Sequence, residues 1–209
     1  MITKLDFHIV RAQYEERENA HLQLRRGLAK GVANAEVFTK HALGITDSHA
    51  NYSASEHKLG PVILVKTPPE RVFKLAQKLD GSPKNHVPKV IYDFEIPSLK
   101  ISVGSELAMM LRPDDLWVGN RRTFWTHILV TNGWKRRPAN MALKLFQQND
   151  PNAEMDYGVW KYLYLDIEKS LIEVADKGAQ LAKSQGIVPG NHKFLWADAI
   201  ATSLYESRD

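Results

Sequence analysis

The feature that most constrains this chain is a long apolar stripe near its C-terminal end. Apolar side chains recur within residues 157–185 at spacings that approximate the 3.6-residue turn of an α-helix. The stripe consists of Trp160, Leu163, Ile167, Leu171, Val174 and Leu181. Asp156 is a suitable N-cap, and Gly186 with Pro189 is typical of a helix end. The stripe therefore predicts the longest helix of the chain.

Helical patterns also cover most of the remaining sequence. We expect further helices at about residues 3–30, 34–43, 67–80, 105–111, 121–131, 139–148 and 194–205. Asn34 and Asn120 are suitable N-caps for two of them, and Thr67 before two prolines opens another. Residues 46–60 are polar and rich in Ser and Ala, which favours a surface loop. The predicted fold is a mainly α, single-domain helical bundle over residues 1–209.

One stretch carries a strand-like pattern. Apolar residues alternate over 90–96 and again over 99–103, with Pro97-Ser98 between the two runs. This alternation is compatible with a minor β-hairpin and equally with an extended connection outside any sheet. The prediction therefore allows one small β element within the helical bundle.

Composition excludes several classes of site. The 209 residues include no cysteine, so disulfides and cysteine-ligated zinc or iron–sulfur centres are ruled out. The first eighteen residues are charged and form no signal-peptide core, and no run of 18 apolar residues exists. We therefore expect a cytoplasmic protein that does not engage a membrane. The sequence suggests no metal site and no cofactor.

The net positive charge of this chain is concentrated in residues 116–148, which we call the basic segment. It contains no Asp or Glu, whereas the whole chain has a net charge of only +4. The cations are Arg121, Arg122, Lys135, Arg136, Arg137 and Lys144. Aromatic residues lie among them: Trp117, Phe124, Trp125 and Trp134. Cations mixed with aromatics favour a polyanionic partner, RNA more than DNA, although these aromatics are also typical of a core.

Arg122 and His127 are the one pair in this segment that suggests chemistry. Five residues on a helix correspond to about 140° of rotation and about 7.5 Å of rise, so the pair converges on one phosphate only if the first turn is loosened. His127 would then serve as general acid or base, and Arg122 would stabilise the charge on the phosphate during attack by a 2′-hydroxyl. Asn120, Arg121, Lys135, Arg136 and Arg137 are the candidate substrate-binding residues. The alternative is a surface arginine and a histidine packed at a helix edge.

The spacing from Arg122 to His127 resembles the signature of the HEPN superfamily, an arginine followed after four to six residues by a histidine. Arg121 fits the same pattern with five intervening residues, and Thr123 stands where the family often has another polar residue. The resemblance implies a small helical bundle and a metal-independent ribonuclease of the toxin–antitoxin or phage-defence type. It further implies a homodimer that brings two such sites together, and a protein antitoxin as a partner.

A second function class is compatible with the same residues. The chain could be a non-catalytic helical module of a mobile element that binds nucleic acid or a protein partner. A third, purely structural protein would require the basic segment to be neutralised by acidic residues such as Asp166, Glu168 and Glu173. These alternatives differ in the surroundings that they require for His127 and for the cations.

Overall fold

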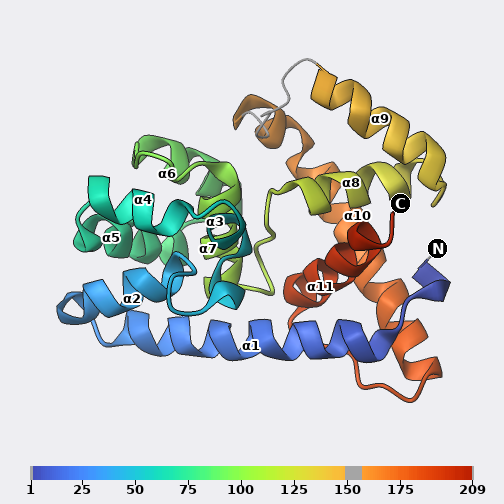
Figure 1. The fold of residues 1–209 in the computed structure, drawn as a ribbon, viewed down its shortest axis with the longest axis horizontal. Helices are drawn as coiled ribbons and strands as arrows, with labels where there is room; N and C mark the ends of the chain where they lie inside the picture. Colours follow the sequence, from blue (N-terminus) through green and yellow to red (C-terminus); the bar gives the residue numbers. More distant parts are fainter. Residues whose placement is uncertain (1, 149–156, 209) are drawn as a thin grey trace. The chain divides into compact units, whose positions relative to one another are not determined.

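Helices form almost all of the regular structure. The computed structural model describes residues 2–148 and 157–208, with the backbone alone for 146–148 and 157–161. It is 76% helical, and no strand occurs among the described residues, which confirms the predicted mainly α bundle. The α-helices are α1 (Phe7–Ala29), α2 (Ala35–Ala42), α3 (Tyr52–Glu56), α4 (Leu59–Lys66), α5 (Pro69–Gly81), α6 (Val87–Asp93), α7 (Ile101–Leu111), α8 (Arg121–Thr131), α9 (Arg136–Gln148), α10 (Tyr157–Ser184) and α11 (Lys193–Glu206) (Figure 1).

The described residues divide into two compact units, and the boundary falls inside α1. One unit comprises residues up to Glu15 together with those from Gly119 onward, and the other comprises Glu16–Val118. The prediction that the whole chain is a single domain stays a prediction. Within the described residues, no helix is long and apolar enough to cross a membrane.

The unit Glu16–Val118 is built around α7. Nine consecutive residues of α7, from Val103 to Leu111, are buried, and the helix packs against α3, α5 and α6. A Cβ on Gly104 would lie 2.7 Å from the Ile91 side chain, so the glycine permits the close approach of α6 to α7. On the other side of α5, α2 packs against it through an edge-to-face contact of Phe38 with Phe73.

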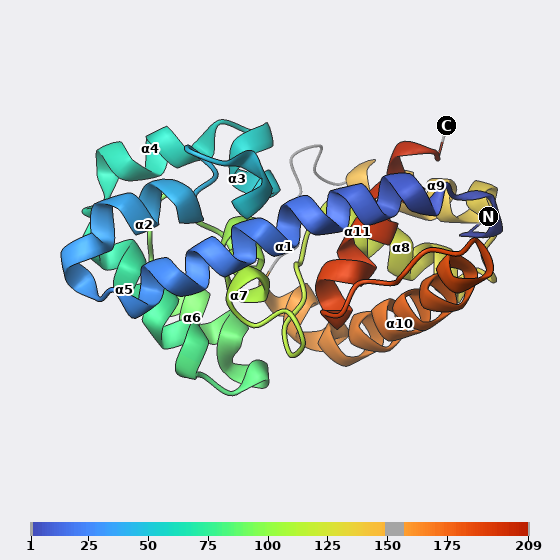
Figure 2. The same cartoon turned by 90° about the horizontal axis from the view of Figure 1, so that it is seen from below.

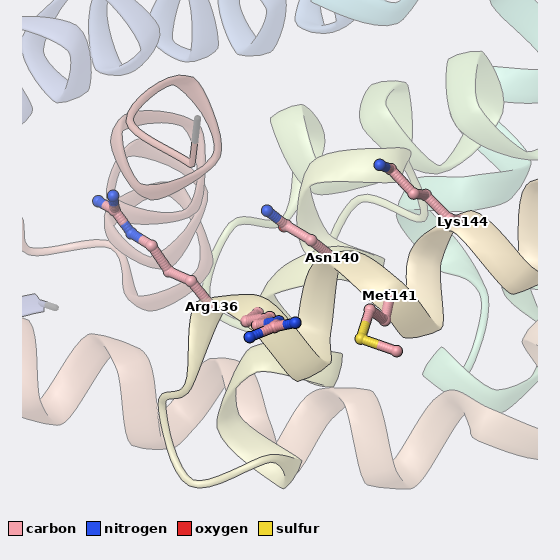
Figure 3. Close-up of a pocket in the computed structure, with 5 residues that line it drawn as sticks. Arg136, Asn140, Met141 and Lys144 are labelled. Carbon is pink, nitrogen blue, oxygen red and sulfur yellow. The ribbon is translucent and has the colours of Figure 1, made fainter.

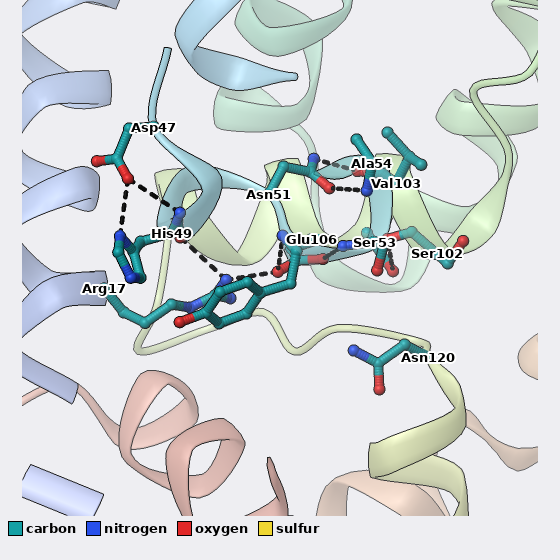
Figure 4. Close-up of polar contacts among 12 residues, drawn as sticks. Arg17, Asp47, His49, Asn51, Ser53, Ala54, Ser102, Val103, Glu106 and Asn120 are labelled. Carbon is teal, nitrogen blue, oxygen red and sulfur yellow. Dashed lines mark hydrogen bonds and ion pairs between the residues drawn. The ribbon is translucent and has the colours of Figure 1, made fainter. Parts of the chain in front are cut away.

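An ion pair between Arg17 and Glu106 lies in this core. The Nη1 atom of Arg17 is 2.5 Å from Oε1 of Glu106, and both side chains are 1% exposed. The same carboxylate accepts hydrogen bonds from the backbone N–H groups of Tyr52, at 3.0 Å, and Ser53, at 2.8 Å (Figure 4). Arg17 also donates to the carbonyl of His49 and lies over the ring of Tyr52. One carboxylate from α7 therefore joins α1 to the first turn of α3.

The other unit is a three-helix core to which α9 is attached. α8, α10 and α11 pack against one another, with Trp125, Leu171 and Trp196 among their buried side chains. α10 and α11 lie side by side in both views (Figure 1, Figure 2). The hydroxyl of Tyr14 accepts hydrogen bonds from the backbone N–H groups of Asn191 and His192, just before α11 begins. The start of α1 thereby contributes to the N-terminal cap of α11.

Two sequence predictions are corrected in the unit Glu16–Val118. Residues 46–60 are not a surface loop, because they form a 3₁₀ turn, α3 and the start of α4. Asn51 is completely buried there: its amide donates to the carbonyls of Ala42 and Val103, and its Oδ1 accepts from the N–H of Ala54. Polar residues in this stretch therefore satisfy internal backbone groups instead of facing solvent.

The second correction concerns residues 90–103, where the sequence allowed either a minor β-hairpin or an extended connection, and no strand is formed. These residues form the end of α6, a connection and the start of α7. Val87, Val90 and Ile91 are buried at helical spacing, while Tyr92, a member of the alternating pattern, is 64% exposed. Ile101 and Val103 are both buried because α7 is covered on all sides, so the alternation carries no information about a sheet face.

The first prediction concerns the buried ion pair. We expect Glu106→Gln to destabilise the protein by about 3–5 kcal/mol at pH 7, because the guanidinium of Arg17 is left in the core without a charged partner. Urea denaturation measures the loss. The matched control is Glu36→Gln, which removes a carboxylate from an exposed i,i+4 pair with Lys40, and we expect almost no change.

The loss of stability in Glu106→Gln should depend on pH, and it should become smaller in acid. Burial alone would raise the pKa of Glu106, but Arg17 and the hydrogen bonds from Ser53 outweigh it and hold the pKa below its ordinary value of 4.5. The ionised carboxylate therefore stabilises the fold above pH 4.5, and this contribution is lost as the pH falls through the lowered pKa. The stability difference between wild type and Glu106→Gln should shrink in that acidic range. A difference that stays constant with pH would contradict the assignment.

Candidate nucleic-acid interface

The basic segment forms α8, a short turn and α9. α8 begins at the residue that the sequence predicts, and its first turn is closed by a capping box. Oδ1 of Asn120 accepts hydrogen bonds from the N–H groups of Arg122 (3.0 Å) and Thr123 (3.1 Å), and the Thr123 hydroxyl accepts from the N–H of Asn120 (3.2 Å). The side-chain oxygen of Asn120, a predicted substrate ligand, is therefore engaged in the cap.

Arg122 and His127 lie on this one regular helix. Arg122 occupies the first turn and is half-buried, and Arg121 beside it is exposed. His127 follows after about 1.4 turns of the helix. Ideal helix geometry separates the two side chains by about 140°. For Arg122 and His127 to converge on one phosphate, the first turn would have to be loosened, and the structure shows a regular, capped turn instead. Approach of Arg122 to His127 would therefore depend on the length of the arginine side chain.

His127 is held in one orientation by α10. Its Nδ1 lies 2.9 Å from the hydroxyl oxygen of Ser170, and that hydroxyl donates its proton to the carbonyl of Asp166. In the tautomer that is protonated on Nδ1, this nitrogen donates to Ser170 and the lone pair lies on Nε2. Burial lowers the pKa of His127, and the charge of Asp166 only partly offsets this effect. The imidazole is therefore neutral at pH 7, a state suited to accepting a proton.

A Schellman motif ends α8. The N–H of Trp134 donates to the carbonyl of Leu129 (2.8 Å) and the N–H of Gly133 to that of Val130 (3.0 Å). Gly133 and Trp134 both have left-handed backbones, with φ of 62° and 63°. The Trp134 indole donates to Glu173 and lies under the ammonium of Lys177, at 4.7 Å. These contacts fix the point at which α9 starts.

α9 carries an open groove of about 430 Å³ on its surface. The lining residues all belong to this helix: Arg136, Arg137, Asn140, Met141 and Lys144. Figure 3 shows Arg136, Asn140 and Lys144 extending to one side of the helix, while Met141 extends to another (Figure 3). Asn140 also attaches α9 to its own unit, because Oδ1 accepts from the Trp125 indole (2.8 Å) and Nδ2 donates to the carbonyl of Arg208 (3.4 Å).

The charges at the start of α9 are arranged against the helix dipole. Lys135 directly precedes the helix, Arg136 and Arg137 open it, and its first turn contains no acidic residue. Cations are unfavourable at this positive end of a helix, where anions are stabilised. Among the described residues, Arg121, Lys135, Arg137 and Lys144 form no ion pair. The positive charges of these four residues are therefore not neutralised by an acidic residue that the structure describes.

The acidic residues that could have neutralised the segment have other contacts. Asp166 lies near enough to His127 to influence its pKa, and Glu173 pairs with Lys177 at 2.6 Å. Hydrogen bonding by Lys177 is the main reason that the pKa of Glu173 is lowered. A purely structural role for the basic segment would require acidic residues such as Glu173 to neutralise its cations. Glu173 pairs with Lys177 instead.

The aromatic residues of the segment belong mainly to the core. Trp117, Phe124 and Trp125 are 2%, 9% and 0% exposed. Trp134 is half-buried between Glu173 and Lys177. Trp117, Phe124 and Trp125 are therefore not available for stacking on a base, and Lys177 lies over the ring of Trp134. The sequence could not distinguish core packing from base stacking for these residues, because spacing alone does not reveal which side chains are exposed.

Sequence reasoning also missed three residues that shape this region: Asn140, Met141 and Ser170. Asn140 could have been found from its position four residues after Arg136 and four before Lys144, which places the three on one helix face. Met141 follows from the same spacing after Arg137. Ser170 carries no sequence signal, since its contact with His127 joins residues 43 apart. Among the described residues, no group of three potential metal ligands occurs.

Comparison with known proteins found no matching family model, no matching curated protein and no matching solved structure. The resemblance to the HEPN superfamily consequently rests on Arg122 and His127 alone and stays a prediction.

The turn between α8 and α9 gives a second prediction. We expect Gly133→Ala to cost about 1 kcal/mol of stability, because φ is positive there although a Cβ would meet nothing within 4 Å. Gly81→Ala is the matched control, since Gly81 also has open space around it but an ordinary φ. Urea denaturation of both variants separates backbone strain from steric effects. Equal stability of the two variants would contradict the role of Gly133.

Proposed function

We propose that this chain is a nucleic-acid-binding protein and that α9 is its principal contact surface. The observation that carries the proposal is the cluster of Lys135, Arg136 and Arg137 at the positive end of α9. Such an arrangement is unfavourable in isolation and becomes favourable when a polyanion is bound. The groove along Arg136, Asn140 and Lys144 extends the same surface by two helical turns. A cytoplasmic location, in contact with nucleic acid, is part of this proposal.

The third prediction tests the surface directly. We expect Arg137→Ala/Lys144→Ala to weaken binding of labelled nucleic acid by roughly 10- to 100-fold at 0.1 M salt, because each lost phosphate contact forfeits counterion release. Fluorescence anisotropy with separate RNA and DNA probes measures the affinity. Both side chains are exposed and form no ion pair with a described residue, so the fold should be unaffected.

The matched control is Lys74→Ala/Lys78→Ala, which removes two exposed cations from α5. We expect the affinity of this variant to stay within about twofold of wild type. Equal losses in both double variants would indicate a nonspecific effect of net charge and would overturn the assignment to α9. Absence of binding to every RNA and DNA probe would overturn the proposed function itself.

A second candidate function is metal-independent RNA cleavage, as the HEPN resemblance implies. The observation that favours it is the hydrogen bond between Nδ1 of His127 and the Ser170 hydroxyl, which in the Nδ1-protonated tautomer orients a neutral imidazole to act as a base through Nε2. Arg122 would hold the phosphate and Arg121 would assist. The 2′-hydroxyl would lose its proton to Nε2 as its oxygen attacks phosphorus, and the 5′-oxygen would leave and take up a proton. A homodimer and a toxin–antitoxin or phage-defence role, with a protein antitoxin as partner, belong to this candidate function.

The fourth prediction concerns this reaction. If the pair is catalytic, purified protein cleaves labelled RNA in EDTA, His127→Ala abolishes the cleavage, and the exposed-histidine variant His57→Ala retains it. Because the pKa of His127 is lowered, the base stays unprotonated below the ordinary value of 6.5, so the rate should rise with pH in a range below 6.5. RNA that is bound but left intact would remove the catalytic candidate and leave the binding function.

A further inference from the structure

The connection between α8 and α9 has the form of a helix-turn-helix. Four residues, 132–135, join the two helices, and the Schellman motif at Gly133 and Trp134 ends the first helix within them. A turn of three or four residues that contains glycine is characteristic of this motif in DNA-binding proteins, where the second helix enters the major groove. Here the second helix is α9.

Packing determines which face of α9 points outward. Ala139 and Leu143 are 0% and 6% exposed and lie on the packed side, and half-buried Asn140 lies at its edge, where it bonds to the Trp125 indole. The opposite side carries four exposed residues at helical spacing, which we call the outer stripe. It consists of Arg137, Met141, Lys144 and Leu145. Met141 and Leu145 are 58% and 63% exposed, so the outer stripe combines cations with apolar groups.

The burial of aromatics distinguishes between kinds of nucleic acid. Single strands are bound chiefly by stacking of bases on exposed aromatic rings, and Trp117, Phe124 and Trp125 are buried. Double-stranded RNA is A-form, and its deep, narrow major groove does not admit a helix. The major groove of B-form DNA is about 12 Å wide and accepts one α-helix. The described exposed side of α9 carries cations and aliphatic side chains rather than rings, so this side of the helix fits duplex DNA best.

We propose that α8, the turn and α9 form a helix-turn-helix that places the outer stripe of α9 in the major groove of duplex DNA. This inference rests on the proposed nucleic-acid-binding function and specifies its ligand. Arg137, in the first turn of α9, lies where recognition helices contact base edges, and its guanidinium can donate twice to guanine. Met141 matches the methyl group of thymine, and Lys144 lies two turns further on, within reach of the phosphate backbone.

The test compares four probes of one sequence by fluorescence anisotropy: duplex DNA, single-stranded DNA, double-stranded RNA and single-stranded RNA. We expect duplex DNA to bind at least roughly tenfold more tightly than the other three at the same salt concentration. Tighter or equal binding of any RNA or single strand would overturn this inference but leave the nucleic-acid-binding function intact. Failure of all four probes to bind would overturn both.

A variant that preserves charge tests the base contact separately. Sequences selected from a random duplex pool by the wild type should show a preferred site, and Arg137→Lys should lose roughly tenfold affinity for it, because lysine cannot form the paired hydrogen bonds. The affinity of Arg137→Lys for an unselected duplex should stay close to that of wild type. Equal effects on both duplexes, or no preferred site at all, would overturn the placement of Arg137 in the major groove.

Discussion

The unit Glu16–Val118 depends on one buried carboxylate. Glu106 lies in a helix that is covered on all sides, and it could not remain ionised there without compensation for the lost hydration. Arg17 supplies the opposite charge, and the first two N–H groups of α3 supply hydrogen bonds that the short helix cannot satisfy internally. A five-residue helix is too short to be stable alone. The same interaction therefore neutralises a buried charge, caps a marginal helix and connects three segments that are distant in sequence.

The other unit reaches a defined geometry by local means. α8 is specified at both ends by its own neighbours, through the Asn120 capping box and the Schellman motif at Gly133. Longer-range contacts then fix α9: Trp134 is held by Glu173 and Lys177, and Asn140 by Trp125. Arg136 takes part in this attachment through a hydrogen bond to Ser207, whereas Arg137 and Lys144 are exposed and form no ion pair with a described residue. A helix that is fixed by contacts on its packed side presents its exposed side in one orientation, so less conformational entropy is lost when a ligand binds.

Local signals account for the successes of the sequence predictions, and long-range contacts account for the failures. The helix at 121–131 was predictable because its cap and its stop are adjacent residues. The helices within 46–60 were not, because Asn51 finds one of its partners at Val103, 52 residues away. Alternation at 99–103 suggested a strand because α7, which begins there, is buried on nearly every side and has no polar face to mark a helical period. The cations of the interface were readable from the sequence, whereas the hydrogen bond that orients His127 comes from a serine 43 residues distant.

The charge distribution in the basic segment favours a binding role over a catalytic one. Electrostatics that oppose local helix stability, as at Lys135, Arg136 and Arg137, are expected where function outweighs folding. His127 shows the reverse, since its neutral, hydrogen-bonded state is also what the fold favours for a half-buried imidazole. Its environment is therefore explained without a substrate, while that of Lys135 and Arg137, which form no ion pair with a described residue, is not. The proposed function is therefore based on the start of α9. Cleavage at His127 would require an RNA bound to α9 that also reaches Arg122.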